Sequence, residues 1–189
     1  MREVKKVTLS AVMCALAVAI MTLGAVVETV DMTMAALASL TAVLVYIEIG
    51  SPYTYLTWIV TSLLVGLIFP QSLMWAEYLL LFGVYPFLKG YIERLPRMTW
   101  PFVKFVYFNA ALLGLAYLIQ LILGVRFFGE GADVSLLIDL PFLEGNVPLA
   151  LLIVGAVANV ALYAYDMFLT VIVRLYCAKY RSKFKRFFK

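Results

Sequence analysis

Long runs of apolar residues alternate with short polar turns along the chain. A helix that crosses a bilayer needs about 20 mostly apolar residues, and runs of this kind recur here. The pattern predicts six membrane-spanning helices, over residues 7–27, 32–49, 53–69, 72–88, 102–125 and about 148–173. The third and fourth runs are the shortest. Turns that contain Gly or Pro, at 50–52 and 70–72, flank the third run.

The composition agrees with a membrane protein. Of the 189 residues, 65% are hydrophobic and only 14% are charged, which lies outside the usual range of globular domains. We therefore expect an all-α integral membrane protein with one six-helix domain, residues 1–176, followed by a tail, residues 177–189. Residues 7–27 resemble a signal peptide after their basic start, but the run is long enough to be a retained first helix.

Basic residues mark one side of the predicted membrane domain. All Lys and Arg residues except Arg126 fall near the N-terminus, between 89 and 104, or between 174 and 189. An even number of predicted crossings separates these clusters. Because Lys and Arg are enriched at cytoplasmic ends of spans, both termini are predicted to be cytoplasmic. We expect a multi-pass protein of a bacterial cytoplasmic membrane, in contact with lipid, with Trp75 and Trp100 at the interfaces.

Several function classes lose their usual residues. The chain has no histidine, which removes the commonest general base and metal ligand. Its net charge of +4 comes from cations that flank the spans, so we expect no nucleic-acid partner. Cys14 and Cys177 are predicted at different depths, which argues against a disulfide. No motif for phosphate binding or nucleophilic catalysis is present. The sequence thus predicts no enzyme, no catalytic residue, no cofactor and no metal site.

A strip of small residues follows the first predicted helix. Ala11, Ala15 and Ala19 are four residues apart, so they share one face and let another backbone approach closely. Two interpretations are open. The strip packs against a neighbouring helix of the same bundle, or it is a docking face for a separate membrane subunit.

A polar stripe follows the last predicted helix. At helical spacing it contains Gly155, Asn159, Tyr163, Asp166 and Thr170. A carboxylate within a span is costly and needs a partner. Asn109 on the fifth predicted helix lies at a similar depth to Asp166, and Lys104 lies closer to the cytoplasm. Asp166 is then either a structural clamp, bonded to Asn109 or paired with Lys104, or it is part of a proton or ion site or of the floor of a ligand cavity.

A second group of polar and aromatic residues is predicted in the outer half of the last three helices. Its members, Trp75, Glu77, Tyr78, Tyr117, Gln120 and Asn159, are typical of a small-molecule pocket if those helices are neighbours. The apolar loop at 124–147 would cover it. The alternative for Glu77 is an interfacial carboxylate favoured by a helix N-terminus.

The tail, residues 177–189, alternates basic with aromatic residues. This pattern is typical of a helix that lies on anionic lipid. Recruitment of a cytosolic partner is the alternative.

The layout resembles the substrate-binding S-components of energy-coupling-factor vitamin transporters. It shares six short spans, cytoplasmic termini, an alanine-rich first helix and an outer loop before the last span. The resemblance implies that Ala11, Ala15 and Ala19 dock to a membrane coupling subunit, which works with ATPase subunits. It also implies a small-molecule ligand, with candidate pocket residues Trp75, Glu77, Tyr117, Asn159 and Tyr163.

The chain is also similar in size and span count to the small membrane subunit of the bacterial rod-shape elongation machinery. That resemblance implies a non-catalytic scaffold of a cell-envelope assembly complex. The basic, aromatic tail and a structural role for Asp166 fit this alternative.

Overall fold

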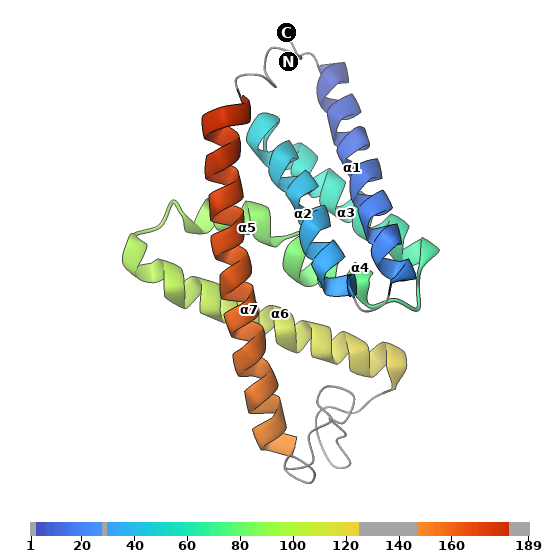
Figure 1. Ribbon diagram of the computed structural model, residues 1–189, viewed down its shortest axis with the longest axis vertical. Helices are drawn as coiled ribbons and strands as arrows, with labels where there is room; N and C mark the ends of the chain where they lie inside the picture. Colours follow the sequence, from blue (N-terminus) through green and yellow to red (C-terminus); the bar gives the residue numbers. More distant parts are fainter. Residues whose placement is uncertain (1–2, 28–29, 125–146, 182–189) are drawn as a thin grey trace.

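The computed structural model describes residues 3–27, 30–124 and 147–181, and all regular structure in these ranges is helical (Figure 1). Five helices are long and apolar enough to cross a membrane. They are α1 (Glu3–Val26), α2 (Asp31–Glu48), α3 (Ser51–Ile68), α6 (Trp100–Leu123) and α7 (Val147–Leu175). The covering loop predicted at 124–147 lies almost wholly outside the described residues, as does the tail beyond residue 181.

Helices α1, α2 and α3 form one packed group (Figure 1). Small, fully buried residues on α1 and α2, among them Ala17, Ala35 and Ala38, let the helices approach closely. The buried Thr54 and Thr57 of α3 donate hydrogen bonds to carbonyls of the preceding turn. Their hydroxyl groups are therefore satisfied without an external partner.

The two ends of this group differ. We call the end where α2 begins the Asp31 end and the end where α2 finishes the Glu48 end. α1 starts at the Glu48 end, where Tyr53 of α3 donates a hydrogen bond to Glu3. α7 finishes there too, where Tyr176 donates to Glu48 Oε1 at 3.2 Å. The α2–α3 turn at this end requires Gly50, whose φ of 109° favours glycine.

The fourth predicted span, residues 72–88, is not a single helix. The structure instead has α4 (Met74–Glu77), a π-helical turn (Tyr78–Phe82), a break at 83–84, and α5 (Tyr85–Ile92). Pro86 is in the first turn of α5. In a continuous helix its ring would clash with the carbonyl four residues earlier, so the helix is interrupted before it.

Gly83 lies at the break and allows close packing there. A Cβ at this position would lie 2.6 Å from Cδ1 of Trp58 and 2.7 Å from the carbonyl oxygen of Tyr78. Both distances are shorter than real Cβ contacts. Only glycine fits between the α3 indole and the π-helical backbone.

Side chains from three other helices satisfy the carbonyls of the π-helical turn. Trp58 Nε1 of α3 donates to Leu79 O at 3.1 Å. Tyr107 of α6 donates to Leu80 O at 2.7 Å, and Tyr165 of α7 donates to Phe82 O at 3.4 Å. Irregular backbone at membrane depth is tolerated where protein groups replace its hydrogen bonds. The break is therefore built into the packing of the molecule.

Residues 72–92, which we call the broken segment, run alongside α2 in the same direction. Near its start Ser72 donates a hydrogen bond to Asp31, at the beginning of α2. Near its end Gly90 lies against the Tyr46 ring, two residues before α2 finishes. The interval from Asp31 to Tyr46 corresponds to about 22 Å of helix. The segment thus connects the two ends of the molecule although no helix within it is long enough to do so.

α6 and α7 cross one another beside this group (Figure 1). At the crossing Asn109 of α6 and Asn159 of α7 exchange two hydrogen bonds of 3.2 Å. Tyr163 of α7 donates to the carbonyl of Pro101 on α6 at 3.1 Å. Polar contacts therefore fix the crossing point of two otherwise apolar helices.

Candidate functional site

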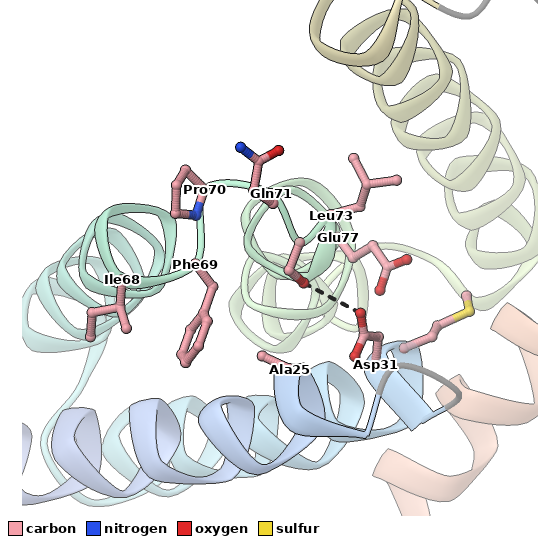
Figure 2. A pocket seen from close by; sticks show the side chains of 10 residues that line it. Ala25, Asp31, Ile68, Phe69, Pro70, Gln71, Leu73 and Glu77 are labelled. Atoms are coloured by element: carbon pink, nitrogen blue, oxygen red, sulfur yellow. Dashed lines mark hydrogen bonds between the residues drawn. The ribbon is translucent and has the colours of Figure 1, made fainter.

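A cavity of about 650 Å³ opens at the Asp31 end of the molecule (Figure 2). This volume lies within the range of small-molecule sites, about 300 to 1,000 Å³. The cavity is formed where α1 finishes, α2 begins and the chain turns from α3 into α4. Its lining residues are Ala25, Asp31, Met32, Ile68, Phe69, Pro70, Gln71, Ser72, Leu73 and Glu77.

Two carboxylates, those of Asp31 and Glu77, lie next to each other on one side of the cavity, and Ile68 and Phe69 lie on the opposite side (Figure 2). Asp31 Oδ2 accepts a hydrogen bond of 3.3 Å from the Ser72 hydroxyl. That hydroxyl in turn accepts one from the backbone N–H of Met74, at 3.2 Å. These bonds tie the start of α2 to the turn before α4, so they position the acidic side of the cavity.

The Glu77 carboxylate is less well satisfied. Its Oε2 atom is buried and has no hydrogen-bond partner among the described residues. A buried polar atom without a partner costs about 1–3 kcal/mol, and more when the group is charged. The neighbouring Asp31 adds like-charge repulsion. Glu77 Oε2 could therefore accept a hydrogen bond from a ligand, and a positively charged donor would be favoured.

The five predicted pocket residues are not gathered around this cavity. Only Glu77 lines it. The indole of Trp75 packs against α3 at Gly66, and Tyr117 of α6 is 63% exposed. Asn159 and Tyr163 lie at the α6–α7 crossing, where both bond to α6. Sequence reasoning missed Asp31, Gln71 and Ser72, which come from the start of α2 and from the turn between α3 and α4.

Asp166 is the centre of a second polar cluster, nearer the Glu48 end. Its Oδ1 accepts hydrogen bonds from Lys89 and from the Tyr85 hydroxyl, the latter at 2.6 Å. Its Oδ2 accepts from Lys104 at 2.6 Å. Asp166 and both lysines are only 6–7% exposed. The carboxylate thus joins α5, α6 and α7 through three donors.

The Asp166 cluster contains one of the two partners predicted for it. Lys104 is paired with Asp166, whereas Asn109 bonds to Asn159 instead. Lys89 was missed, because it was assigned to a basic cluster that fixes orientation. A signal was available in the four-residue spacing of Tyr85 and Lys89, which places both on one face of α5.

The positive charges of the Asp166 cluster are paired with carboxylates. Lys89 Nζ also donates to Thr170 at 2.8 Å and lies 3.3 Å from the half-exposed carboxylate of Glu93. Two lysines thereby face two carboxylates. Buried charges that are fully paired are tolerated, whereas removal of one partner is strongly destabilising. This arrangement holds three segments together and leaves Asp166 without a free oxygen.

The small-residue strip of α1 is not used for packing within the described protein. Ala11, Ala15 and Ala19 are all exposed, while Cys14 and Ala17 face inward. Ala11 and Ala15 line an apolar groove of about 440 Å³ between α1 and α3, with Leu56 and Val60 on the α3 side. The strip therefore faces the surroundings of the bundle.

The described residues contain no group of three or more potential metal ligands of the His, Cys, Asp or Glu type. Comparisons of the chain with protein-family models, with curated proteins and with solved structures found no match. The cavity at the Asp31 end, the Asp166 cluster and the exposed strip of α1 are therefore the features that bear on function.

Proposed function

We propose that this protein is the solute-binding membrane subunit of a multi-subunit importer. The cavity at the Asp31 end carries the proposal. Its volume suits a small molecule, and its walls combine apolar groups with a few polar ones, as ligand sites usually do. The sequence contains no nucleotide-binding motif, so energy would come from partner subunits with ATPase activity.

The distribution of charge supports an outward-facing cavity. Asp31 and Glu77, at the cavity, are both acidic, whereas Lys5, Lys6 and Arg181 lie toward the Glu48 end. Because cytoplasmic ends are rich in Lys and Arg, the Asp31 end would face outward in a bacterial cytoplasmic membrane. The broken segment along α2 supplies the fourth crossing that this orientation requires, which keeps both termini on the cytoplasmic side.

The exposed strip on α1 supports docking to an integral-membrane partner. Small residues on an exposed helix face allow close backbone contact, from which membrane helices gain much of their packing energy. Ala15 lies midway along the strip and borders the α1–α3 groove. Ala15→Leu would fill this approach and abolish co-purification of the partner. Leu16→Ala, at a neighbouring exposed position, is the matched control and should leave co-purification intact.

The decisive experiment for solute binding is native mass spectrometry of the protein purified in detergent. We expect one small molecule per chain in the wild type. Ala25→Phe places a ring in the cavity that Ala25 lines and should abolish the adduct. Val26→Phe, at an adjacent residue that is 74% exposed and outside the lining, should retain it. Persistently empty wild-type protein would contradict the proposal.

A non-catalytic scaffold of a cell-envelope assembly complex is the second candidate. The observation that favours it is the Asp166 cluster, which fastens three segments through fully paired charges. A scaffold would purify empty and together with cell-wall assembly proteins. An importer subunit would purify with solute and with ATPase subunits.

A further inference from the structure

Among the described residues, the charged side chains that line the cavity at the Asp31 end are two carboxylates, Asp31 and Glu77. They lie together on one side of the cavity (Figure 2). The described lining residues include no Lys or Arg. A solute that enters the cavity therefore meets two carboxylates on one side of it.

Glu77 provides an independent indication, because one of its carboxylate oxygens lacks a hydrogen-bond donor among the described residues. Glu77 Oε2 is buried without a hydrogen bond from the described protein. The Ser72 hydroxyl is engaged with Asp31 and with the backbone of Met74. No described residue donates to Glu77 Oε2. A cationic donor on the solute would satisfy this oxygen and would also relieve the repulsion from Asp31.

We propose that the solute is an organic ammonium compound whose charged nitrogen binds between Asp31 and Glu77. This inference rests on the proposed function and specifies its substrate class. The rest of the molecule would lie against Ile68, Phe69 and Leu73, the apolar part of the wall. Gln71, at the rim, offers an amide for a polar substituent.

The size and composition of the cavity favour an organic cation over a metal ion. A volume of about 650 Å³ far exceeds the space of a single ion. Ca²⁺ takes six to eight oxygen ligands, and Mg²⁺ takes six. The side chains of the described lining offer two carboxylates, one amide and one hydroxyl, and the other six lining residues are apolar. An aliphatic or aromatic ammonium compound uses both kinds of surface.

The test compares three probes of one skeleton, phenethylamine, 2-phenylethanol and phenylacetate, with Ca²⁺ as a fourth arm. Binding to the purified protein is measured by native mass spectrometry and by the shift in melting temperature. We expect phenethylamine to bind at least about tenfold more tightly than the neutral and anionic probes, because a charge-assisted hydrogen bond discriminates by that much.

Variants assign the effect to the cavity. Glu77→Gln keeps the shape but removes the charge, and it should raise the dissociation constant for phenethylamine at least about tenfold. Glu77→Asp should retain the preference. Glu3→Gln removes an exposed carboxylate at the opposite end and should leave the dissociation constant for phenethylamine unchanged. The melting temperature of each variant without probe confirms that it is folded.

The outcomes separate this inference from the proposed function. Equal binding of all three probes, preference for the neutral or anionic probe, or no binding of phenethylamine would overturn the ammonium assignment. Ca²⁺ binding that depends on Glu77 and excludes phenethylamine would replace it by a metal site. In each case a co-purified solute that Ala25→Phe displaces would leave the proposed function standing, whereas protein that is empty throughout would remove both.

Discussion

The acidic sites at Asp166 and at Glu77 differ in how completely their carboxylates are paired. Asp166 has donors on both oxygens, two of them lysines, and it does not line the cavity at the Asp31 end. Glu77 has a buried oxygen without a donor and lines a large cavity beside a second carboxylate. A saturated carboxylate has no capacity left for a ligand, so we interpret Asp166 as structural and Glu77 as part of a binding site.

The broken segment connects these two sites. Glu77 ends α4 at one end of it, and Lys89 lies on α5 near the other. The break at 83–84 lies between them. Trp58, Tyr107 and Tyr165 donate hydrogen bonds to the π-helical turn directly before it. A change at the break would therefore affect both sites. Substitutions at Asp166, Gly83 and Glu77 should separate the roles of the two sites and the break.

The largest effect is expected from Asp166→Asn. The change leaves Lys89 and Lys104 buried without their shared carboxylate, which costs about 3–5 kcal/mol in unfolding free energy. Thermal unfolding in detergent, followed by tryptophan fluorescence, measures the loss. A triple variant should recover most of the stability, because it removes all three buried charges together: Lys89→Met, Lys104→Met and Asp166→Leu. A single Asp166→Asn variant as stable as wild type would contradict the structural interpretation and favour an ion site.

A smaller loss is expected from Gly83→Ala. The new methyl group would meet the Trp58 ring and the carbonyl of Tyr78, and backbone cannot move aside cheaply. Overpacking of this kind costs about 1–3 kcal/mol. Gly114→Ala is the matched control, since the nearest atom to its Cβ is Leu80 Cδ1 at 3.6 Å, an ordinary contact. Equal melting temperatures for the two variants would mean that the tight packing at the break does not contribute to stability.

Much of the fold could be predicted from the sequence, because long apolar runs define helices by themselves. The first three helices lie within a few residues of their predicted bounds. The fourth differs because mean hydropathy over 72–88 is insensitive to Gly83 and Pro86. The break also depends on donors from Trp58, Tyr107 and Tyr165, which come from helices whose neighbours the sequence does not specify.

The candidate site was predicted less well, for a related reason. Depth along a helix follows from residue number, so Lys104 could be matched to Asp166. Residue number does not give the rotation of a helix about its axis or the way in which α6 crosses α7. Tyr117 is consequently exposed, and Asn159 bonds to Asn109 rather than lining the cavity. Asp31 was not among the predicted pocket residues, because its place beside Glu77 depends on how the ends of three helices meet.

The smallest effect on stability, and the sharpest contrast with Asp166, is expected from Glu77→Gln in solute-free protein. This substitution removes a half-buried charge that lacks a full set of donors and faces Asp31, so the unfolding free energy should rise by about 1 kcal/mol. Thermal unfolding measures it beside Asp166→Asn under the same conditions. A loss of stability as large as that of Asp166→Asn would mean that Glu77 is also a structural partner, and the distinction between the two carboxylates would fall. A small gain in unfolding free energy, together with weaker ammonium binding, would mean that the Glu77 carboxylate contributes to binding at a cost in stability. This is the trade-off expected of a binding site.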